Sequence, residues 1–413
     1  MRILILSHYY DPEPIPKPAE LAQALVRRGH QVYVLTGFPN YPSGRLYPGF
    51  RLRLMSKEER SGISIIRAFT APYHGPSLIG RFLNYASTAI FAIIASIRTP
   101  PCDVIYVYHP PLTIGLSAFI IGFLKRAPFV YDVQDIWPDS VVWSGMLTNR
   151  TIIGLLHYVE RFVYRRANHI LVVTSGAKKN LLVKGVSLDK ITVASHWVDE
   201  EMFRSKAENN GADVREKYGL GNRLVVMFAG NIGIVQGLET VLRCADLLRD
   251  ELGIVFILVG DGADRERLIS LSRSMALPNV VFVDRQPLTA MPAILGCADA
   301  LLVHLKRSEL SQVSIPTKTL AYLAVGRPII MAVEGASAEL ITQARAGVVV
   351  PPGNPKALAE AVLTLTRLPL SERMAMGENG RNFLSTEFAR EKILDQYVSI
   401  LRAACDRPIR QKT

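Results

Sequence analysis

The sequence predicts an α/β protein built from two Rossmann-like, doubly wound parallel-sheet domains that face a central cleft. Short apolar segments rich in Val and Ile recur along the chain and mostly lack alternating polar residues, which is typical of strands buried on both faces. Amphipathic helical patterns separate these segments, as expected for parallel sheets covered by helices. The length of 413 residues favours two or three domains. The apolar segments form two groups, separated by a strand-free stretch near residues 193–213.

Each group contains several predicted strands with helices between them. In the first half the strands are residues 2–7, 31–36, 63–68, 103–108, 128–133 and 169–174. In the second half they are residues 224–229, 254–259, 279–283, 299–303, 328–332 and 347–350. The segment "AELAQALVRRGH" illustrates the helices, since it places Leu21 and Leu25 on one face and ends at Gly29. We therefore predict a first domain at 1–198, a second at 199–386, and a C-terminal segment at 387–413 whose helix returns to the first domain.

The composition indicates a folded protein with reduced cysteines. Hydrophobic residues make up 49% of the chain and charged residues 20%, which argues against disorder. The four cysteines are scattered and form no C-x-x-C pair, so neither a metal knot nor a disulfide framework is predicted. The apolar run at the N-terminus is too short for a signal peptide and is interpreted as a first strand. A cytoplasmic protein fits these features best.

Positive charge is concentrated in the first half of the chain. The formal net charge is +11 over residues 1–198 and +1 over residues 199–413. A basic domain beside a neutral one suggests that the first domain meets an anionic surface. No motif or aromatic-basic interleaving typical of nucleic-acid binding is present, so anionic lipid is the favoured partner.

Two helical segments of the first half are more apolar than a surface helix requires. Residues 77–97 carry only Arg81 as a charge and are almost long enough to span a bilayer. We expect this helix to lie at a membrane interface and not to cross it. Residues 112–126 end in Lys125 and Arg126, and we expect this second segment to be a buried helix of the fold.

Three glycines after a predicted strand suggest a phosphate-binding loop. In "FAGNIGIVQGLETV", Gly230, Gly233 and Gly237 allow a tight turn and bring backbone amides close to a ligand. The helix that follows offers unpaired N–H groups and the positive end of its dipole. The alternative is an ordinary turn, and this stretch alone does not decide between the two.

Two further segments of the second half also combine a turn with the start of a helix, where an anion could bind. "LVGDGADRERL" is a strand, a Gly-Asp-Gly turn and a helix start, whose alternative reading is a simple capped turn. "SIPTKTLAYLAVGRPII", residues 314–330, places Lys318 near a helix N-terminus. A cation adds a full charge to the helix dipole, although a lone lysine is more often a solvated surface residue.

Together, these three elements resemble the donor domain of retaining glycosyltransferases of family 4, which have the glycosyltransferase B fold. The N-terminal half is similar to the same family in "DPEPIPKPAELAQALVRRGHQVYVLT", "DVIYVYHPP" and "VYDVQDIWPDS". The resemblance covers nearly the whole chain. "GFPNYPSG", "VQDIWPDS" and "GNIGIVQGLE" look like the fucosamine-transferring and colanic-acid branch, whose members build bacterial surface polysaccharides.

The resemblance implies a site for the diphosphate of a nucleotide sugar in the second domain. Fixed donors there would stabilise the charge that develops when the sugar–phosphate bond breaks. Lys318 is the candidate catalytic cation. The residues expected to bind the donor are Gly230, Asn231, Gly233, Gln236, Gly237, Asp261, Arg285, Pro316, Thr317 and Lys318. No metal and no cofactor are expected, because Lys318 and the loop amides can take the phosphate charge.

The chain departs from the family pattern at three places. Gln236 stands where most members have a lysine, and Lys318 is expected to supply the missing charge. The family's Glu-x7-Glu pair falls on Val313 and Ala321, so ribose must be held in another way. Pro16, Lys17 and Pro18 replace the family's Gly-Gly turn near the N-terminus.

Two residues of the first domain are candidates for the sugar pocket. His109 follows a strand and precedes two prolines, where family members often carry a sugar-binding histidine. A structural histidine is an equally good interpretation, and Tyr108 is an alternative match. Asp135 follows the next strand, near Trp137, in the residue types common in sugar sites. Its alternative role is that of a helix N-cap.

These features predict a metal-independent retaining glycosyltransferase that transfers an N-acetylfucosamine-like sugar from a UDP-sugar to a polyprenyl-diphosphate-linked saccharide. Its place would be in O-antigen, capsule or lipopolysaccharide biosynthesis, as a peripheral protein on the cytoplasmic face of the cell membrane. Contacts with the acceptor or the anionic membrane are expected from Lys17, Arg81, Lys125 and Arg126. The alternative is a non-catalytic scaffold that binds a nucleotide sugar and a membrane.

Overall fold

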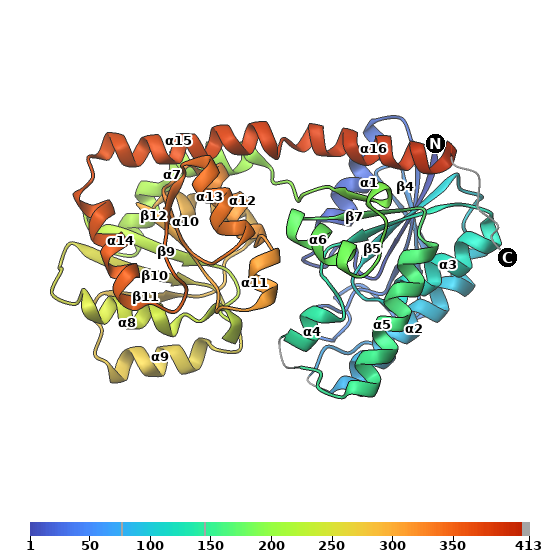
Figure 1. Ribbon diagram of the computed structural model, residues 1–413, viewed down its shortest axis with the longest axis horizontal. Helices are drawn as coiled ribbons and strands as arrows, with labels where there is room; N and C mark the ends of the chain where they lie inside the picture. The colour runs from blue at the N-terminus through green and yellow to red at the C-terminus, as the bar shows by residue number, and fades with distance from the viewer. Residues whose placement is uncertain (76, 144–145, 407–413) are drawn as a thin grey trace. The chain divides into compact units, whose positions relative to one another are not determined.

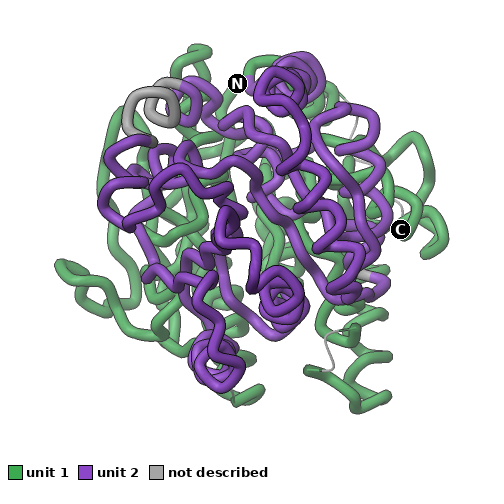
Figure 2. Tube along the Cα trace, turned by 90° about the vertical axis from the view of Figure 1, so that its left-hand side faces the viewer, with its two compact units in different colours: residues 1–194, 391–413 green, residues 195–390 purple. Residues whose placement is uncertain are grey.

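The computed structural model describes residues 1–75, 77–143 and 146–406, without the side chains of residues 205–211 and 310. The chain divides into two compact units (Figure 2). Unit 1 comprises Met1–Ala194 and Glu391–Thr413, of which residues 407–413 lie outside the described part, and unit 2 comprises Ser195–Arg390. Each unit contains one predominantly parallel sheet with helices between its strands (Figure 1). The prediction of two doubly wound domains is confirmed.

The sheet of unit 1 has the strand order β3-β4-β2-β1-β5-β6-β7-β8. Only β3 is antiparallel to its neighbour. The strands are β1 (Arg2–Ser7), β2 (Gln31–Gly37), β3 (Met55–Arg60), β4 (Ile63–Ala68), β5 (Val104–His109), β6 (Phe129–Val133), β7 (His169–Val172) and β8 (Ile191–Val193). The helices are α1 (Lys17–Arg27), α2 (Leu78–Ser96), α3 (Thr113–Lys125), α4 (Asp139–Trp143), α5 (Arg150–Arg166), α6 (Ser175–Val183), the 3₁₀ turn η1 (Leu188–Lys190) and α16 (Arg390–Asp406).

The sheet of unit 2 is entirely parallel, with the order β11-β10-β9-β12-β13-β14. The strands are β9 (Leu224–Ala229), β10 (Ile254–Val259), β11 (Val280–Val283), β12 (Ala300–His304), β13 (Ile329–Ala332) and β14 (Gly347–Val349). The helices are α7 (Glu200–Lys217), α8 (Glu239–Leu247), α9 (Arg265–Ser274), α10 (Met291–Gly296), α11 (Glu309–Val313), α12 (Thr317–Val325), α13 (Ala336–Ala344), α14 (Pro355–Arg367) and α15 (Leu370–Glu387), with 3₁₀ turns η2 (Ile234–Gln236) and η3 (Leu288–Ala290). The strand order reverses between β9 and β12, and ligands of such sheets bind beyond the strand ends at this switch point.

Two strands of unit 1 were not predicted from the sequence. Strand β3, "MSKEER", contains four charged residues and has no buried position. It can be polar because it lies at the edge of the sheet, next to β4 alone, where its side chains meet water. Strand β8 at the opposite edge has only three residues. Hydrophobic runs identify strands that are buried on both faces, so edge strands of this kind give no such signal.

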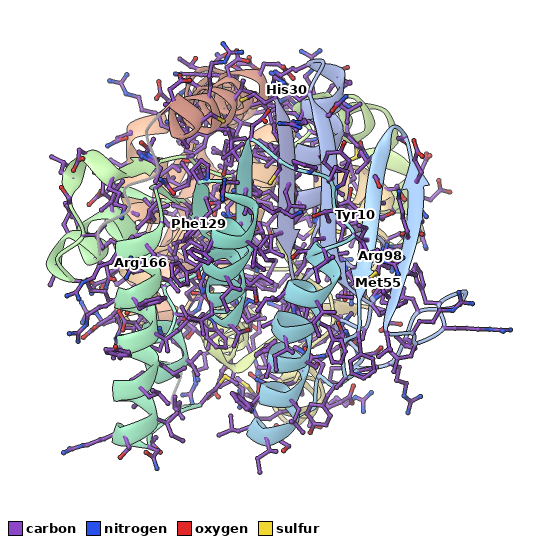
Figure 3. All side chains as sticks on the ribbon, turned by 90° about the vertical axis from the view of Figure 1, so that its right-hand side faces the viewer. Tyr10, His30, Met55, Arg98, Phe129 and Arg166 are labelled. Atoms are coloured by element: carbon purple, nitrogen blue, oxygen red, sulfur yellow. The ribbon has the colours of Figure 1, made fainter. Side chains whose placement is uncertain are left out.

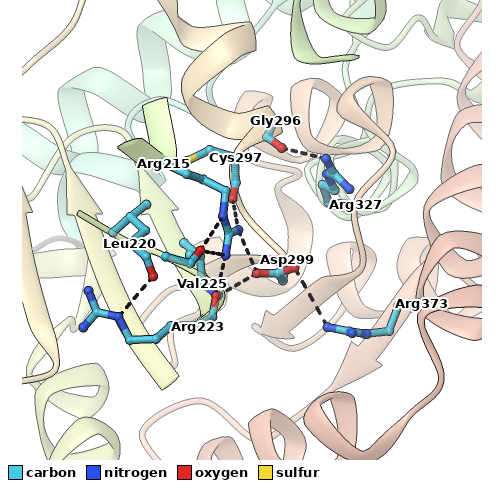
Figure 4. Close-up of polar contacts among 10 residues, drawn as sticks. Arg215, Leu220, Arg223, Val225, Gly296, Cys297, Asp299, Arg327 and Arg373 are labelled. Carbon is cyan, nitrogen blue, oxygen red and sulfur yellow. Dashed lines mark hydrogen bonds and ion pairs between the residues drawn. The ribbon is translucent and has the colours of Figure 1, made fainter. Parts of the chain in front are cut away.

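The predicted strand-free join is occupied by a long helix. Helix α7 runs through the Asn-Asn-Gly sequence at residues 209–211, inside the stretch where no strand was predicted. Asp199 caps the helix by accepting a hydrogen bond from the backbone amide of Met202. Near its end, Arg215 donates to the carbonyl of Cys297 at 2.8 Å and pairs with Asp299 at 3.1 Å (Figure 4). Contacts with the body of unit 2 therefore fix the helix, and local sequence does not show them.

Helix α16 packs on unit 1 through a buried polar cluster. The hydroxyl of Tyr397 donates to Asp132 at 2.9 Å, and Tyr106 donates to the same carboxylate. The ammonium of Lys17 lies 3.3 Å from Asp132. Breaking such a buried charge pair is costly, so this cluster holds α16 and the start of α1 on the sheet.

Candidate functional site

Three of the predicted donor-binding segments of unit 2 follow C-terminal strand ends of its sheet. Gly230 comes directly after β9, and its amide donates to the carbonyl of Val259 at the end of β10. Gly260 comes after β10, and its amide donates to the carbonyl of Val283 at the end of β11. The Gly-rich loop, the Gly-Asp-Gly turn and the segment before Arg285 therefore begin at one edge of the sheet, as ligand sites of parallel sheets do.

The Gly-rich loop and the Gly-Asp-Gly turn support each other through their backbones. The amide of Ile232 donates to the carbonyl of Asp261 at 2.8 Å, and the amide of Asp264 donates to the carbonyl of Ile232 at 3.0 Å. The carboxylate of Asp261 accepts from the amide of Gly262 at 2.8 Å. The two loops thus form one backbone unit, in which Asp261 caps the turn.

Gly237 ends the phosphate loop in a conformation that suits glycine. It has φ +62° and follows the 3₁₀ turn η2. A Cβ atom at this position would lie 2.9 Å from Cγ of Lys306 and 3.0 Å from Cε1 of His304. A side chain at position 237 would therefore push the loop away from the end of β12.

Helix α12 is attached to the end of β9 by a tyrosine that sequence reasoning missed. The hydroxyl of Tyr322 accepts from the amide of Ala229 at 2.8 Å and donates to the carbonyl of the same residue at 3.0 Å. Pairing of β9 with β12 ends at Met227, which leaves Ala229 available for these bonds. Lys318 lies one turn before Tyr322 on the helix, so the attachment brings Lys318 next to the loop.

The side chain of Lys318 extends into the Gly-rich loop. A Cβ atom at Gly230 would lie 2.9 Å from its Nζ, so glycine leaves room for the ammonium. Nζ donates to Oε1 of Gln236 at 3.3 Å and lies 3.8 Å from the centre of the Phe228 ring. Burial lowers the pKa of Lys318 to about 7. Lys318 forms no ion pair with the carboxylates that the structure describes, so its charge lacks a counter-ion.

The other predicted donor residues lie around this loop without forming a closed pocket by themselves. Asn231 and Arg285 are exposed, and Gly233 precedes η2. Pro316 is the N-cap residue of α12, and Thr317 is its first residue. The structure therefore brings Gly230, Gln236, Gly237 and Lys318 together. Ligand contacts of these residues stay predictions, as do those of Asn231, Gly233, Asp261, Arg285, Pro316 and Thr317.

His109 of unit 1 is the last residue of β5 and is 1% exposed. Among the described residues, neither of its ring nitrogens has a hydrogen-bond partner. Burial, with a smaller contribution from Lys184, lowers the pKa of His109 to about 3. The ring is therefore neutral near pH 7 and can donate one hydrogen bond and accept another.

Asp135 lies near His109 at the same edge of the unit 1 sheet. His109 pairs with Val133 at the end of β6, and the amide of Gln134 donates to the carbonyl of His109 at 3.3 Å. Burial raises the pKa of Asp135, because a partly buried carboxylate loses hydration. The sheet thus places the two predicted sugar-pocket residues on neighbouring strand ends. Their contacts with a sugar stay predictions.

Lys17 was predicted to contact the acceptor or the membrane, and its position corrects the membrane part of this prediction. Its side chain is 7% exposed and pairs with Asp132, and its ammonium also donates to Gln134 at 3.1 Å. A cation held inside the unit by a buried carboxylate cannot reach lipid headgroups. The motif around Lys17 is therefore part of the packing of α1 on the sheet.

An apolar surface extends over three helices of unit 1. Figure 3 shows α5, α3 and α2 on one face of the unit, and Arg166 marks the end of α5. The exposed apolar residues of α2 and its end are Leu78, Ile79, Phe82, Leu83, Ile90, Ile94 and Ile97, those of α3 are Ile120, Phe123 and Leu124, and those of α5 are Ile152, Leu155 and Tyr158. We call these residues the apolar face. Helix α2 is long and apolar enough to cross a membrane by length and composition, and only 28% of its apolar window is buried.

The apolar face corrects one prediction from the sequence. Residues 112–126 were expected to form a buried helix, but the last turns of α3 are exposed, with Phe123 at 78%. The reason is that one side of α3 is buried through residues such as Ile114 and Ile121, whereas its other side, with Phe123 and Leu124, is exposed. Apolarity on all sides of a helix therefore does not imply burial here.

The three basic residues predicted for this surface differ in their hydrogen-bond partners. The guanidinium of Arg81 donates to the carbonyl of Gly75 at 2.9 Å. The ammonium of Lys125 donates to the carbonyl of Thr99 at 2.8 Å. Arg126 is exposed at the C-cap of α3. Carbonyl oxygens do not neutralise the cations, so all three keep their positive charge beside the apolar face.

Comparison with known proteins identifies related sequences for both halves of the chain. The family described as "Glycosyl transferase 4-like domain" matches residues 17–197, and the family described as "Glycosyl transferases group 1" matches residues 223–367. A putative colanic acid biosynthesis glycosyl transferase, WcaI of Escherichia coli, is 28% identical over 97% of this chain and 100% of its own length. The probable glycosyltransferase WbjE of Pseudomonas aeruginosa is 26% identical over 72% of each chain.

Solved structures show the same fold. HepE of Anabaena, solved in complex with UDP-glucose, matches with a TM-score of 0.72 at 16% identity, over 98% of this chain and 100% of its own. WaaG, a glycosyltransferase involved in lipopolysaccharide biosynthesis, matches with a TM-score of 0.67 at 17% identity, over 97% and 99% of the two chains. At such identities the similarity establishes the glycosyltransferase B fold alone.

Proposed function

Because the chain belongs to glycosyltransferase family 4 and is related to surface-polysaccharide enzymes, we propose that it transfers a sugar from a UDP-sugar to a lipid-linked saccharide. The observation that carries this proposal is the ammonium of Lys318, which lies inside the Gly-rich loop of unit 2 without a carboxylate partner among the described residues. A desolvated cation without a counter-ion is a site for an anion. The diphosphate of a nucleotide sugar supplies one.

The geometry accounts for the chemistry expected of this site. Cleavage of the sugar–phosphate bond leaves negative charge on the diphosphate, and fixed donors stabilise that charge in a site with little water. Lys318 and the N-terminus of α12 are such donors. Stabilisation by these groups would need no metal ion, and transfer with retention of configuration follows the family resemblance.

The apolar face supports a location at the membrane. Its helices α2, α3 and α5 carry Arg81, Lys125, Arg126 and Arg150, while the first turns of α2 and α5 contain no acidic residue. Buried apolar side chains and cations near an anionic leaflet both favour binding, by about 1 kcal/mol for each cation. We place the protein on the cytoplasmic leaflet, with a polyprenyl-diphosphate-linked saccharide as acceptor.

Binding to anionic vesicles is expected, and salt should weaken it. Replacing Phe82 and Phe123 of the apolar face by Asp should abolish co-sedimentation with vesicles that contain phosphatidylglycerol, because charged side chains then face the bilayer. Charge reversal at Arg81 and Arg126 should lower the bound fraction severalfold and weaken its salt dependence. UDP binding should be unchanged in all variants. Equal sedimentation of wild type and the Asp variant would contradict the assignment of this face.

The proposed reaction is tested by offering purified protein a panel of UDP-sugars with polyprenyl-diphosphate-linked acceptors. The panel should include UDP-N-acetylfucosamine, and the anomeric configuration of the product should be read by NMR. Transfer of a sugar to the lipid-linked acceptor without added metal, and in the presence of EDTA, is expected. Tight UDP-sugar binding without transfer or hydrolysis for any combination would instead favour the non-catalytic scaffold, which the absent carboxylates at Val313 and Ala321 suggest.

A further inference from the structure

His304 connects two loops of unit 2 and was not singled out by any sequence pattern. It is the last residue of β12 and is 1% exposed. Its Nδ1 lies 2.6 Å from the carbonyl oxygen of Gln236, and its Nε2 lies 3.3 Å from the backbone nitrogen of Gly353. A carbonyl only accepts and an amide N–H only donates, so Nδ1 carries the proton and Nε2 accepts. The neutral ring therefore bridges the phosphate loop and the loop between β14 and α14.

The phosphate loop rests on the end of β12 through further contacts. The backbone amide of Lys306 donates to the carbonyl of Val235 at 2.9 Å. The Cα position of Gly237 lies so close to the imidazole that a Cβ atom would be 3.0 Å from Cε1 of His304. The residues of η2 are thus held in place from the side of β12.

Gln236 links His304 to Lys318. Its backbone carbonyl accepts from Nδ1 of His304, and its side-chain oxygen accepts from Nζ of Lys318 at 3.3 Å. A shift of the Gln236 backbone would therefore move the hydrogen-bond partner of the lysine as well. His304 is buried and contacts Gln236, so it would act on the site through this neighbour.

We propose that His304 is a positioning residue of the donor site, which fixes Gln236 and thereby sets where the Lys318 ammonium meets the diphosphate. The inference rests on the proposed function, because it assumes that a nucleotide sugar binds at this loop. His304 is expected to affect the affinity for the donor and the rigidity of the phosphate loop. It would not take part in the chemical step directly.

The bridge makes donor binding sensitive to acid. Protonation of Nε2 would turn the acceptor for the Gly353 amide into a second donor, which breaks that bond. Burial lowers the pKa of His304, the carbonyl of Gln236 opposes this shift, and the cation of Lys306 adds to it. Gly353 contributes a backbone amide, and Lys318 contacts the far end of Gln236. The contribution of His304 to donor affinity should therefore be constant above the ordinary histidine pKa and fall as the pH drops below it.

Three variants distinguish a positioning role of His304 from a role in the stability of the fold alone. His304→Leu removes both hydrogen bonds. His304→Asn keeps a side-chain N–H where Nδ1 lies but cannot titrate. His30→Leu in unit 1 is the matched control for loss of a histidine. Calorimetry measures binding of UDP-glucose between pH 5 and 8, because its diphosphate does not titrate in this range. Hydrogen exchange of residues 230–240 in the ligand-free protein reports the order of the loop.

The Leu variant should bind UDP-glucose about tenfold more weakly at pH 7.5 and exchange faster in residues 230–240, because a hydrogen-bonding group is lost in a buried place. The Asn variant should bind within about threefold of wild type and lose the decline at acid pH. The proposal would be overturned if the Leu variant showed unchanged hydrogen exchange in residues 230–240 and unchanged affinity for UDP-glucose. It would also be overturned if the affinity of the Asn variant for UDP-glucose still fell at acid pH. If wild type binds no UDP-glucose but exchange still separates Leu from wild type, the donor assignment fails and the loop positioning stands.

Discussion

Replacing Lys318 by alanine is expected to lower transfer from the UDP-sugar by about 10²-fold or more. Loss of one charge-assisted donor at a site of developing negative charge typically has an effect of this order. The structure gives the reason, since Nζ of Lys318 lies inside the Gly-rich loop and forms no ion pair with a described carboxylate. Steady-state kinetics and UDP binding by calorimetry measure the effect.

Two further variants separate the charge of Lys318 from its packing. Lys318→Met keeps an unbranched chain over the ring of Phe228 but removes the ammonium, and it should lose as much activity as Lys318→Ala. Lys356→Ala is the matched control, because Lys356 is also the second residue of a helix, α14, and is exposed. Wild-type kinetics in Lys318→Met would show that the ammonium does not meet the donor.

The pKa of Lys318 adds a pH dependence with a defined sign. In the free protein burial lowers this pKa to about 7, and a bound diphosphate would raise it because the anion favours the charged form. Donor binding at pH 8 should therefore take up close to one proton, and the Kd should rise with pH above about 7. Calorimetry in buffers of different ionisation enthalpy counts the protons. Lys318→Met should show no uptake, and an equal uptake in that variant would assign the proton to another group.

Replacing His109 by phenylalanine is expected to lower sugar transfer by about tenfold or more while leaving the protein at least as stable. The two ring nitrogens have no partner among the described residues, and a buried polar atom without a partner costs about 1–3 kcal/mol. Phenylalanine keeps an aromatic ring beside Tyr131 and removes that cost, so the melting temperature should stay or rise. Transfer should fall because a sugar hydroxyl loses its partner.

UDP binding provides the second measurement for His109. The donor loops belong to unit 2, so His109→Phe should bind UDP as wild type does. Asp135→Asn should likewise keep UDP affinity and lower transfer. The pKa of His109 is about 3, so the rate should show no titration of this residue between pH 5 and 8. Full transfer activity in His109→Phe would show that the histidine only fills space in the core.

The sequence predicted the elements whose burial is complete on both sides. Strands such as β1, β5, β9 and β10 are continuous apolar runs, and these runs identify parallel strands without further information. The glycines of the phosphate loop were also predictable, because strand, turn and helix follow each other within one short segment. In each case the pattern that predicts the element lies within one short segment of the sequence.

Contacts between residues that are far apart in the sequence could not be predicted from local patterns. Tyr322 reaches Ala229, Arg215 reaches Asp299 and His304 reaches Gly353 across separations of 93, 84 and 49 residues. Strand β3 is polar because it lies at a sheet edge, and α7 is helical because unit 2 packs against it. Neither condition is visible locally.

The sequence by itself determined two doubly wound sheets, the loops that follow their strands and the excess of cations in the first half. The tertiary structure decided which polar groups have partners. It buried Lys17 against Asp132, left Lys318 without a carboxylate partner among the described residues, and exposed one side of α3 as part of an apolar face. The physical reason is that hydrophobic periodicity sets which segments become strands and helices. Desolvation and pairing of a charge depend on neighbours that only the folded chain brings together.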